Sequence, residues 1–233
     1  MIKLFEENSY IREFETQIIN VNIEKNLIEL EKTAFYGKSG GQPGDIGTLT
    51  TSMETVEVIE TLKKEDTLLH QVKSIKNLKI GNLIKGRINW DKRYKFMKMH
   101  TALHLLCAVI PMGVTGGQIG DVKSRLDFNA DANSLNKEDI QEKLNQILKN
   151  NHEIKYEWIE NKELEKKPEL VRTMSVKPPK TNGKIRLVKI GNVDLQPCGG
   201  THVKNTSEIG MIIIGKIENK GRMNRRVNIS LND

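Results

Sequence analysis

The sequence predicts an α+β protein in which a β-rich N-terminal domain, a small barrel or a sandwich, precedes a mixed α/β domain. Short apolar segments separated by turn residues fill most of the chain up to residue 90, which is the pattern of small β domains. From about Trp90 onward, apolar residues recur at helical spacing in two segments. Three strand-like segments close the chain, so helices and strands share the second domain.

The N-terminal strands follow from apolar runs and the turn residues between them. Residues 14–21 and 27–30 predict a hairpin with Asn26 near its turn. Gly81 and Gly86 interrupt the later part of this region, as glycine commonly does between or within short strands. The other strands expected here are 56–62, 68–72 and 83–88.

The C-terminal elements begin with a helix over residues 93–110, which Pro111 and Gly113 should end. Asn136 can cap a second helix, because Glu138 and Asp139 fall in its first turn and its apolar residues share one face. Strands are expected at 185–190, 211–217 and 226–231. We place the domain boundary near residue 90, which gives domains 1–90 and 91–233.

The composition limits the class of protein. The chain has 233 residues, of which 37% are hydrophobic and 29% charged, and this suits a folded domain rather than a disordered chain. The first residues lack the features of a secretory signal, and no segment has the roughly 20 apolar residues of a membrane span, so a cytoplasmic protein is expected. The net charge of +7 suits a partner such as RNA, although a general richness in lysine explains it equally well.

Two distant segments carry the residues of a metal site. His100 and His104 are four positions apart on the first predicted helix, so both imidazoles project from one face. Cys198 and His202 bracket two glycines, which let the backbone bend until both side chains converge. Nitrogen with one sulfur ligand favours zinc, while another transition metal stays possible. One cysteine among histidines favours a catalytic site; if His202 lies outside the first coordination shell, water takes its place.

These motifs resemble a known family. The segment His100-Thr101-Ala102-Leu103-His104-Leu105-Leu106, together with Cys198-Gly199-Gly200-Thr201-His202, resembles the paired motifs of the editing domains of alanyl- and threonyl-tRNA synthetases and of their freestanding relatives, the AlaX proteins. Residues 33–47 are similar to the glycine-rich motif of alanyl-tRNA synthetase and of longer AlaX forms, and unlike the threonyl enzyme. Residues 216–227 resemble the closing strand pair of the family.

The resemblance implies a medium-length AlaX protein, with a β-barrel-like N-terminal domain and a two-layer α/β editing domain around one zinc ion. It implies a trans-editing hydrolase that needs no ATP and deacylates mischarged tRNA(Ala), charged with serine or also with glycine, in the service of translation fidelity. The partner is charged tRNA(Ala), with no membrane; monomer and dimer both stay open. The alternatives are deacylation of another mischarged tRNA such as Ser-tRNA(Thr), and a non-catalytic RNA-binding module with structural zinc.

The same resemblance assigns further site residues. Gln118 is similar to a glutamine implicated in editing, and Thr115 to a threonine that selects serine, beside the pocket residues Gly199, Gly200 and Thr201. Without the resemblance, Gln118 reads as a solvated strand residue, and the basic tail as a solvated charged face. The glycine-rich motif contributes Gly40, Gly41, Gln42, Pro43 and Asp45. Candidates for contacts to tRNA phosphates are Lys216, Lys220, Arg222, Arg225 and Arg226.

Overall fold

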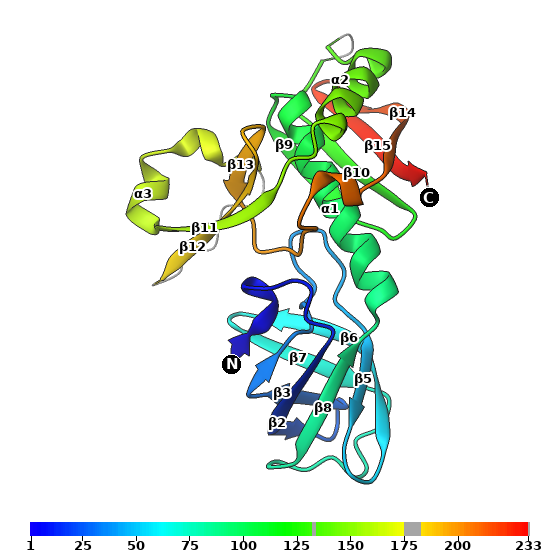
Figure 1. Ribbon diagram of the computed structural model, residues 1–233, viewed down its shortest axis with the longest axis vertical. Coiled ribbons are helices and arrows are strands. Elements are labelled where there is room, and N and C mark those ends of the chain that lie inside the picture. Colours follow the sequence, from blue (N-terminus) through cyan, green and yellow to red (C-terminus); the bar gives the residue numbers. More distant parts are fainter. Residues whose placement is uncertain (132–133, 175–182, 233) are drawn as a thin grey trace. The chain divides into compact units, whose positions relative to one another are not determined.

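The computed structural model describes residues 1–131, 134–174 and 183–232. Its backbone contacts divide the chain into two compact units, Met1–Tyr94 and Lys95–Asp233, which are coloured along the sequence in Figure 1. Across the described ranges, every helix is too short or too polar to span a lipid bilayer. Each unit is described on its own below.

The first unit is a closed six-stranded barrel, so the barrel rather than the sandwich forms. Its strands follow one another in the order β2-β3-β7-β6-β5-β8, and pairing of β8 with β2 closes the circle. Asn26 has a φ of 51° at the β2–β3 turn, as the predicted hairpin requires. The barrel strands are β2 (Glu13–Asn22), β3 (Leu27–Leu30), β5 (Gly47–Thr50), β6 (Thr55–Lys64), β7 (Thr67–Val72) and β8 (Leu83–Ile88). Outside it lie β1 (Ile2–Lys3), the 3-10 turn η1 (Leu4–Glu6) and β4 (Lys32–Thr33).

Alternate residues of the barrel strands fill its interior. Along β7 and β8 every second residue is buried, as expected for strands with one face toward a core. Phe14 lies against Gly86, where an added Cβ would meet the phenyl ring at 2.5 Å. The interior therefore requires glycine at this position of β8.

A buried ion pair ties the glycine-rich segment to the start of helix α1 (Trp90–Val109). Arg93 is fully buried, and its Nε lies 3.0 Å from each carboxylate oxygen of Asp45. Its Nη atoms donate to the carbonyl oxygens of Ser9, at 2.9 Å, and Ala34, at 2.6 Å. Asp45 also accepts the backbone N–H of Tyr36 at 2.6 Å. The structure thus gives Asp45 an internal role in the first unit.

The second unit contains two sheets. A four-stranded sheet has the order β14-β15-β10-β9, and a three-stranded antiparallel sheet has the order β11-β12-β13 (Figure 1). The first holds β9 (Val114–Gln118), β10 (Lys123–Phe128), β14 (Met211–Gly221) and β15 (Asn224–Asn232), and the second holds β11 (Ile154–Glu160), β12 (Lys184–Ile190) and β13 (Asp194–Pro197). Short helical segments are α3 (Asn161–Glu165), η2 (Pro168–Leu170) and η3 (Thr206–Glu208).

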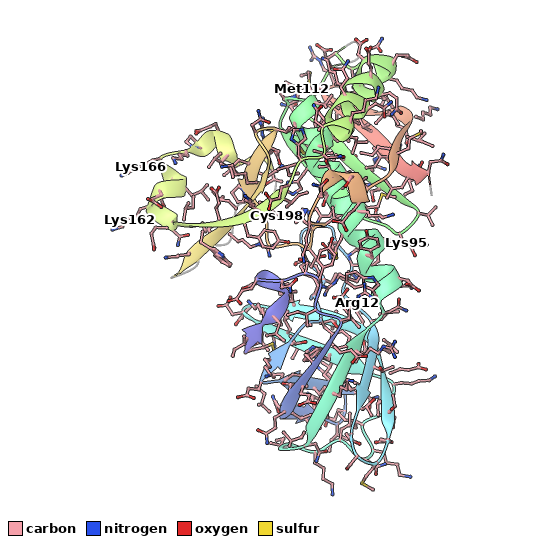
Figure 2. All side chains as sticks on the ribbon, in the orientation of Figure 1. Arg12, Lys95, Met112, Lys162, Lys166 and Cys198 are labelled. Atoms are coloured by element: carbon pink, nitrogen blue, oxygen red, sulfur yellow. The ribbon has the colours of Figure 1, made fainter. Side chains whose placement is uncertain are left out.

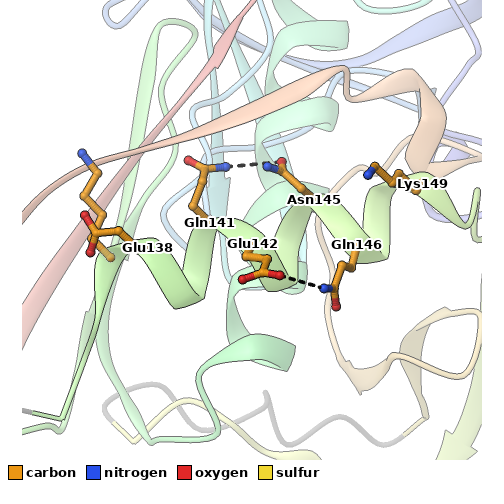
Figure 3. Close-up of a pocket in the computed structure, with 7 residues that line it drawn as sticks. Glu138, Gln141, Glu142, Asn145, Gln146 and Lys149 are labelled. Atoms are coloured by element: carbon orange, nitrogen blue, oxygen red, sulfur yellow. Dashed lines mark hydrogen bonds between the residues drawn. The ribbon is translucent and has the colours of Figure 1, made fainter.

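Helix α2 (Lys137–Lys149) packs against β14. Asn136 accepts the backbone N–H of Asp139 at 2.9 Å, which confirms the predicted cap. Gln141 bonds the strand through both ends of its amide, to the carbonyl of Ile212 at 2.6 Å and the N–H of Ile214 at 2.8 Å. Seven side chains of α2 line a pocket of about 460 Å³, and Figure 3 shows them along the helix. They all come from this one helix, so side chains of different elements do not converge there.

Candidate metal centre

Four side chains of the second unit converge at one point. The donor atoms of His100, His104, Cys198 and His202 all lie within 4.8 Å of one another. The Cys198 Sγ atom is 3.5 Å from Nε2 of His100 and 3.3 Å from Nε2 of His202. Figure 2 shows Cys198 between the three-stranded sheet and helix α1. Nitrogen and sulfur donors at this spacing form a group that could hold a metal ion.

Thr101 fixes the orientation of His202. The Thr101 hydroxyl donates to the carbonyl oxygen of Met97 at 2.9 Å and accepts the N–H of Val203 at 3.3 Å. Its oxygen is 3.1 Å from Nδ1 of His202. Because the hydroxyl proton is used for Met97, Nδ1 of His202 must donate to this oxygen. Nε2 of His202 is then left with its lone pair facing the other donors.

Asp194 fixes the orientation of His104 in the same way. Oδ2 of Asp194 lies 3.0 Å from Nδ1 of His104 and accepts a second bond from Nε2 of Gln196 at 2.8 Å. The Asp194 side chain is fully buried, and its Oδ1 has no hydrogen-bond partner among the described residues. A carboxylate behind a histidine in this position keeps the proton on Nδ1 and leaves Nε2 as a ligand.

The charges of the group favour the ligand form of the cysteine. Burial alone would raise the pKa of the Cys198 thiol, but the charges of His100 and His202 hold it well below its usual range. Burial would lower the pKa of His104, but the hydrogen bonds that it donates to Asp194 and Cys198 outweigh this effect and raise it to about 10. Binding of a metal by Nε2 of His104 therefore releases a proton. By contrast, burial raises the pKa of Cys107 to about 12. Cys107 therefore stays a thiol in the packed interior.

Arg186 supports the loop that carries Cys198 and His202. Its Nε donates to the carbonyl oxygen of Cys198 at 2.9 Å, and its Nη2 donates to that of Gly200. The guanidinium carbon also lies 4.3 Å from the centre of the Tyr156 ring. Arg186 is 5% exposed, so these contacts form in a place where water competes little. Arg186 therefore holds the carbonyl oxygens of Cys198 and Gly200 toward the same guanidinium group.

Sequence reasoning missed Thr101, Asp194 and Arg186. One signal was present for Asp194: it precedes Cys198 by four positions, so the two-residue period of a strand directs both side chains to one face. Thr101 is adjacent to His100 in the sequence, but its partner His202 lies 101 positions away. Arg186 is recognisable only once the pairing of β12 with β13 is known.

The other predicted pocket residues lie on strand β9 and in the loop that follows β13. The Thr115 hydroxyl, on β9, is 3.1 Å from the carbonyl oxygen of Asp127 and 3.3 Å from Oδ1 of Asn224. Gln118 is exposed at the end of the same strand. Gly199 is exposed, whereas Gly200 and Thr201 are buried. These residues all belong to the second unit.

The predicted glycine-rich motif lies in the first unit. Gly40 and Gly41 have φ values of 56° and 81°, which explains glycine at both positions. The backbones of Ser39 and Gln42 bond each other in both directions across this turn. Gln42 is buried, and Pro43 is half-buried.

The five basic residues proposed for tRNA contacts differ in exposure: Arg225 and Arg226 are buried or half-buried, and the other three are exposed. Arg225 is buried, and its Nη1 donates to Asn219, Gly221 and Asn224, so this side chain closes the β14–β15 turn. Arg226 binds both carboxylate oxygens of Asp127 at 2.8 and 2.9 Å. Lys220 pairs with Glu218 at 2.9 Å. The exposed members of the set are Lys216 and Arg222, together with Lys220.

Replacing Asp194 by asparagine is expected to weaken the affinity of the group for added Zn²⁺ by roughly 10- to 100-fold, because the substitution removes the charge that holds the proton on Nδ1 of His104. Competition with a chromophoric chelator measures this affinity. The matched control is Asp127→Asn, which removes a carboxylate paired with Arg226 in the same unit. Equal zinc affinity in the wild type and the Asp194 variant would contradict the assigned role.

Comparisons with known proteins agree with these observations. The family described as threonyl and alanyl tRNA synthetase second additional domain matches residues 185–228, and tRNA synthetases class II (A) matches residues 4–92. The alanyl-tRNA editing protein AlaX-M of Methanosarcina acetivorans is 37% identical over 236 residues, covering 96% of each chain. AlaX-M of Saccharolobus solfataricus is 37% identical over 231 residues, covering 97% of this chain and 96% of its own.

The longer AlaX-L of Pyrococcus horikoshii is 33% identical over 228 residues, and the match covers 94% of this chain but 55% of that protein. The similarity to the AlaX-M proteins extends over nearly their full length and includes both units. The chain belongs to the AlaX family of alanyl-tRNA editing proteins.

Proposed function

We propose that this protein is a zinc-dependent aminoacyl-tRNA deacylase that acts on tRNA(Ala) mischarged with serine, with glycine as a further substrate to be tested. The observation that carries this proposal is the convergence of three imidazoles and one thiol in the second unit. The names of the relatives, alanyl-tRNA editing proteins, give the substrate class. Thr115 and Gln118 stay the candidates for contacts to the amino acid.

The donor set fits one zinc ion held by His100, His104, Cys198 and His202. When bound, zinc polarises an ester carbonyl and makes a nearby water more acidic, and both effects favour ester hydrolysis. Other residues of the chain orient the histidine donors and fix their tautomers. Asp194 and the Thr101 hydroxyl each hold a histidine in the tautomer whose Nε2 faces the group.

Selectivity against alanine follows from the chemistry of the substrate. A pocket that bonds the serine hydroxyl leaves a buried polar group unpaired when alanine occupies it. That penalty is larger than the effect of one missing methyl group, so it separates serine from alanine well. Contacts of the exposed Lys216, Lys220 and Arg222 with tRNA phosphates would hold the body of the substrate.

A second candidate function is a non-catalytic RNA-binding module with a structural zinc ion. The observation that favours it is the number of protein donors, since four ligands are typical of closed structural sites. Its distinguishing consequence is that removing the metal unfolds the second unit, while the metal-loaded protein hydrolyses no charged tRNA.

Deacylation of charged tRNAs in the absence of ATP tests the proposal. We expect Ser-tRNA(Ala) to be hydrolysed at least about 100-fold faster than Ala-tRNA(Ala), because only serine offers the hydroxyl. Gly-tRNA(Ala) and Ser-tRNA(Thr) complete the panel and test the second substrate and the rival tRNA. Equal hydrolysis of the serine and alanine substrates would refute the editing role. Absence of any hydrolysis by folded, zinc-loaded protein would favour the structural zinc site.

A further inference from the structure

One row of residues crosses the three-stranded sheet from edge to edge. Trp158 on β11 lies directly opposite Arg186 on β12. The backbone N–H of Cys198 donates to the carbonyl of Arg186 at 3.1 Å, so Cys198 continues the row just after β13. Residues directly opposed in an antiparallel sheet point to the same face. Trp158, Arg186 and Cys198 therefore share one face of this sheet.

The contacts of Arg186 support this assignment. Its guanidinium reaches the Cys198 carbonyl on one side and lies over the ring of Tyr156 on the other. Tyr156 is paired with Val188, in the neighbouring row of the same face. Cys198, one of the four donors of the metal-binding group (His100, His104, Cys198 and His202), thus lies at the β13 edge of the face, and the Trp158 indole lies at the β11 edge.

The indole is unusually accessible for its size. Trp158 is 42% exposed, while Arg186 beside it is 5% exposed and Val188 is fully buried. The contacts of Arg186 with Tyr156 and with the Cys198 and Gly200 carbonyls account for its burial, and the face is open at Trp158. The row begins at the metal-binding group and ends at this exposed aromatic ring. Such an arrangement suits a ligand with a flat ring that contacts the indole while another part of it lies at the metal-binding group.

The spacing of the sheet identifies the part of the substrate that fits. Two inter-strand steps separate Trp158 from Cys198, which corresponds to about 10 Å between their Cα atoms. In a charged tRNA the amino acid is esterified to the ribose of the 3′-terminal adenosine. A carbonyl placed at the metal-binding group leaves the adenine of that nucleotide one nucleoside length away, which is the region of the indole.

We propose that Trp158 stacks on the adenine of the 3′-terminal nucleotide and so positions the ester at the metal-binding group. The proposal rests on the proposed deacylase function. Stacking of a base on an aromatic side chain contributes about 1–3 kcal/mol when measured by alanine substitution. Every base has a π-face, but only the terminal one lies a single nucleoside away from the ester.

Kinetics of two variants test the proposal in the zinc-loaded, full-length protein. Trp158→Ala is expected to raise the KM for Ser-tRNA(Ala) by about 5- to 100-fold with a smaller change in kcat. Trp158→Phe keeps an aromatic face and is expected to recover most of the loss. Met211→Ala is the matched control, because Met211 is a 57% exposed apolar residue on β14. A wild-type KM in Trp158→Ala would overturn the stacking role.

Fluorescence separates this inference from the deacylase function. The chain has two tryptophans, so a Trp90→Phe background leaves Trp158 as the single reporter. Titration with AMP is expected to quench its emission, and ribose 5-phosphate, which lacks the base, is expected to leave it unchanged. If the wild type hydrolyses no charged tRNA, the proposed function fails and this titration still decides the stacking. If the wild type is active but AMP and ribose 5-phosphate act alike, stacking fails and the deacylase stands.

Discussion

Cys198→Ala is expected to lose stoichiometric zinc and to hydrolyse Ser-tRNA(Ala) at least about 100-fold more slowly than the wild type. The substitution removes the only sulfur donor of the group, whose pKa the neighbouring histidines hold well below the usual range. A bound metal supplies several kcal/mol of charge stabilisation to ester hydrolysis, and each 1.4 kcal/mol corresponds to about tenfold in rate. Metal analysis of the purified variant and single-turnover deacylation measure the two effects separately.

The matched control for this variant is Cys107→Ala. Cys107 is buried on helix α1, and burial raises the pKa of its thiol to about 12, so it is a poor ligand. The control should lose some stability through a small cavity and keep both its zinc and its activity. Undiminished zinc content and rate in Cys198→Ala would refute the metal-centred proposal. Loss of both in Cys107→Ala as well would point to a general packing defect.

Arg93→Met is expected to lower the free energy of unfolding of the first unit by about 3–5 kcal/mol, because it leaves the Asp45 carboxylate buried without its cation. The fully buried guanidinium also donates hydrogen bonds to the carbonyl oxygens of Ser9 and Ala34, and the substitution removes both donors. Urea unfolding followed by the emission of Trp90, which belongs to the same unit, reports on this region in a Trp158→Phe background.

Two comparisons make the Arg93 result specific. Lys73→Met breaks an exposed pair with Glu57, in which both side chains are more than half exposed, and should change stability little. The double variant Arg93→Met, Asp45→Leu removes both charges and should recover part of the lost stability. A single Arg93 variant as stable as the wild type would show that the buried pair is dispensable.

Local signals predicted much of the fold. Asn26 marked the turn of a hairpin, and the Asn136 cap with its acidic first turn marked α2. Strand β5 was not predicted, because Gly47 and the glycines before it looked like a loop. In the structure the backbone around Gly47 lies so close to Arg87 and Ile88 that a side chain has no room. A close approach between strands is a tertiary fact that a single segment does not reveal.

The candidate site also combines residues that the sequence predicts with residues that only the structure reveals. The four donors fall in two short motifs whose spacing is readable along the chain. The residues that orient them are isolated polar side chains, and their partners depend on strand register and on contacts about 100 positions apart. Arg225 illustrates the converse: the basic run that contains it suggests RNA contact, and the structure adds that its guanidinium bonds the neighbouring turn.

The separation of the two donor segments has a consequence for how the second unit holds together. His100 and Cys198 are 98 positions apart, so an ion bound by both acts as a cross-link across most of that unit. In the chain-entropy model, a covalent bridge that closes a loop of about 100 residues lowers the entropy of the denatured state. This stabilises the folded state by about 4–5 kcal/mol. A coordinated ion that dissociates on unfolding acts by mass action instead, so thermal resistance rises with the concentration of free metal. The melting temperature would then report the metal supply of the surroundings as well as the sequence.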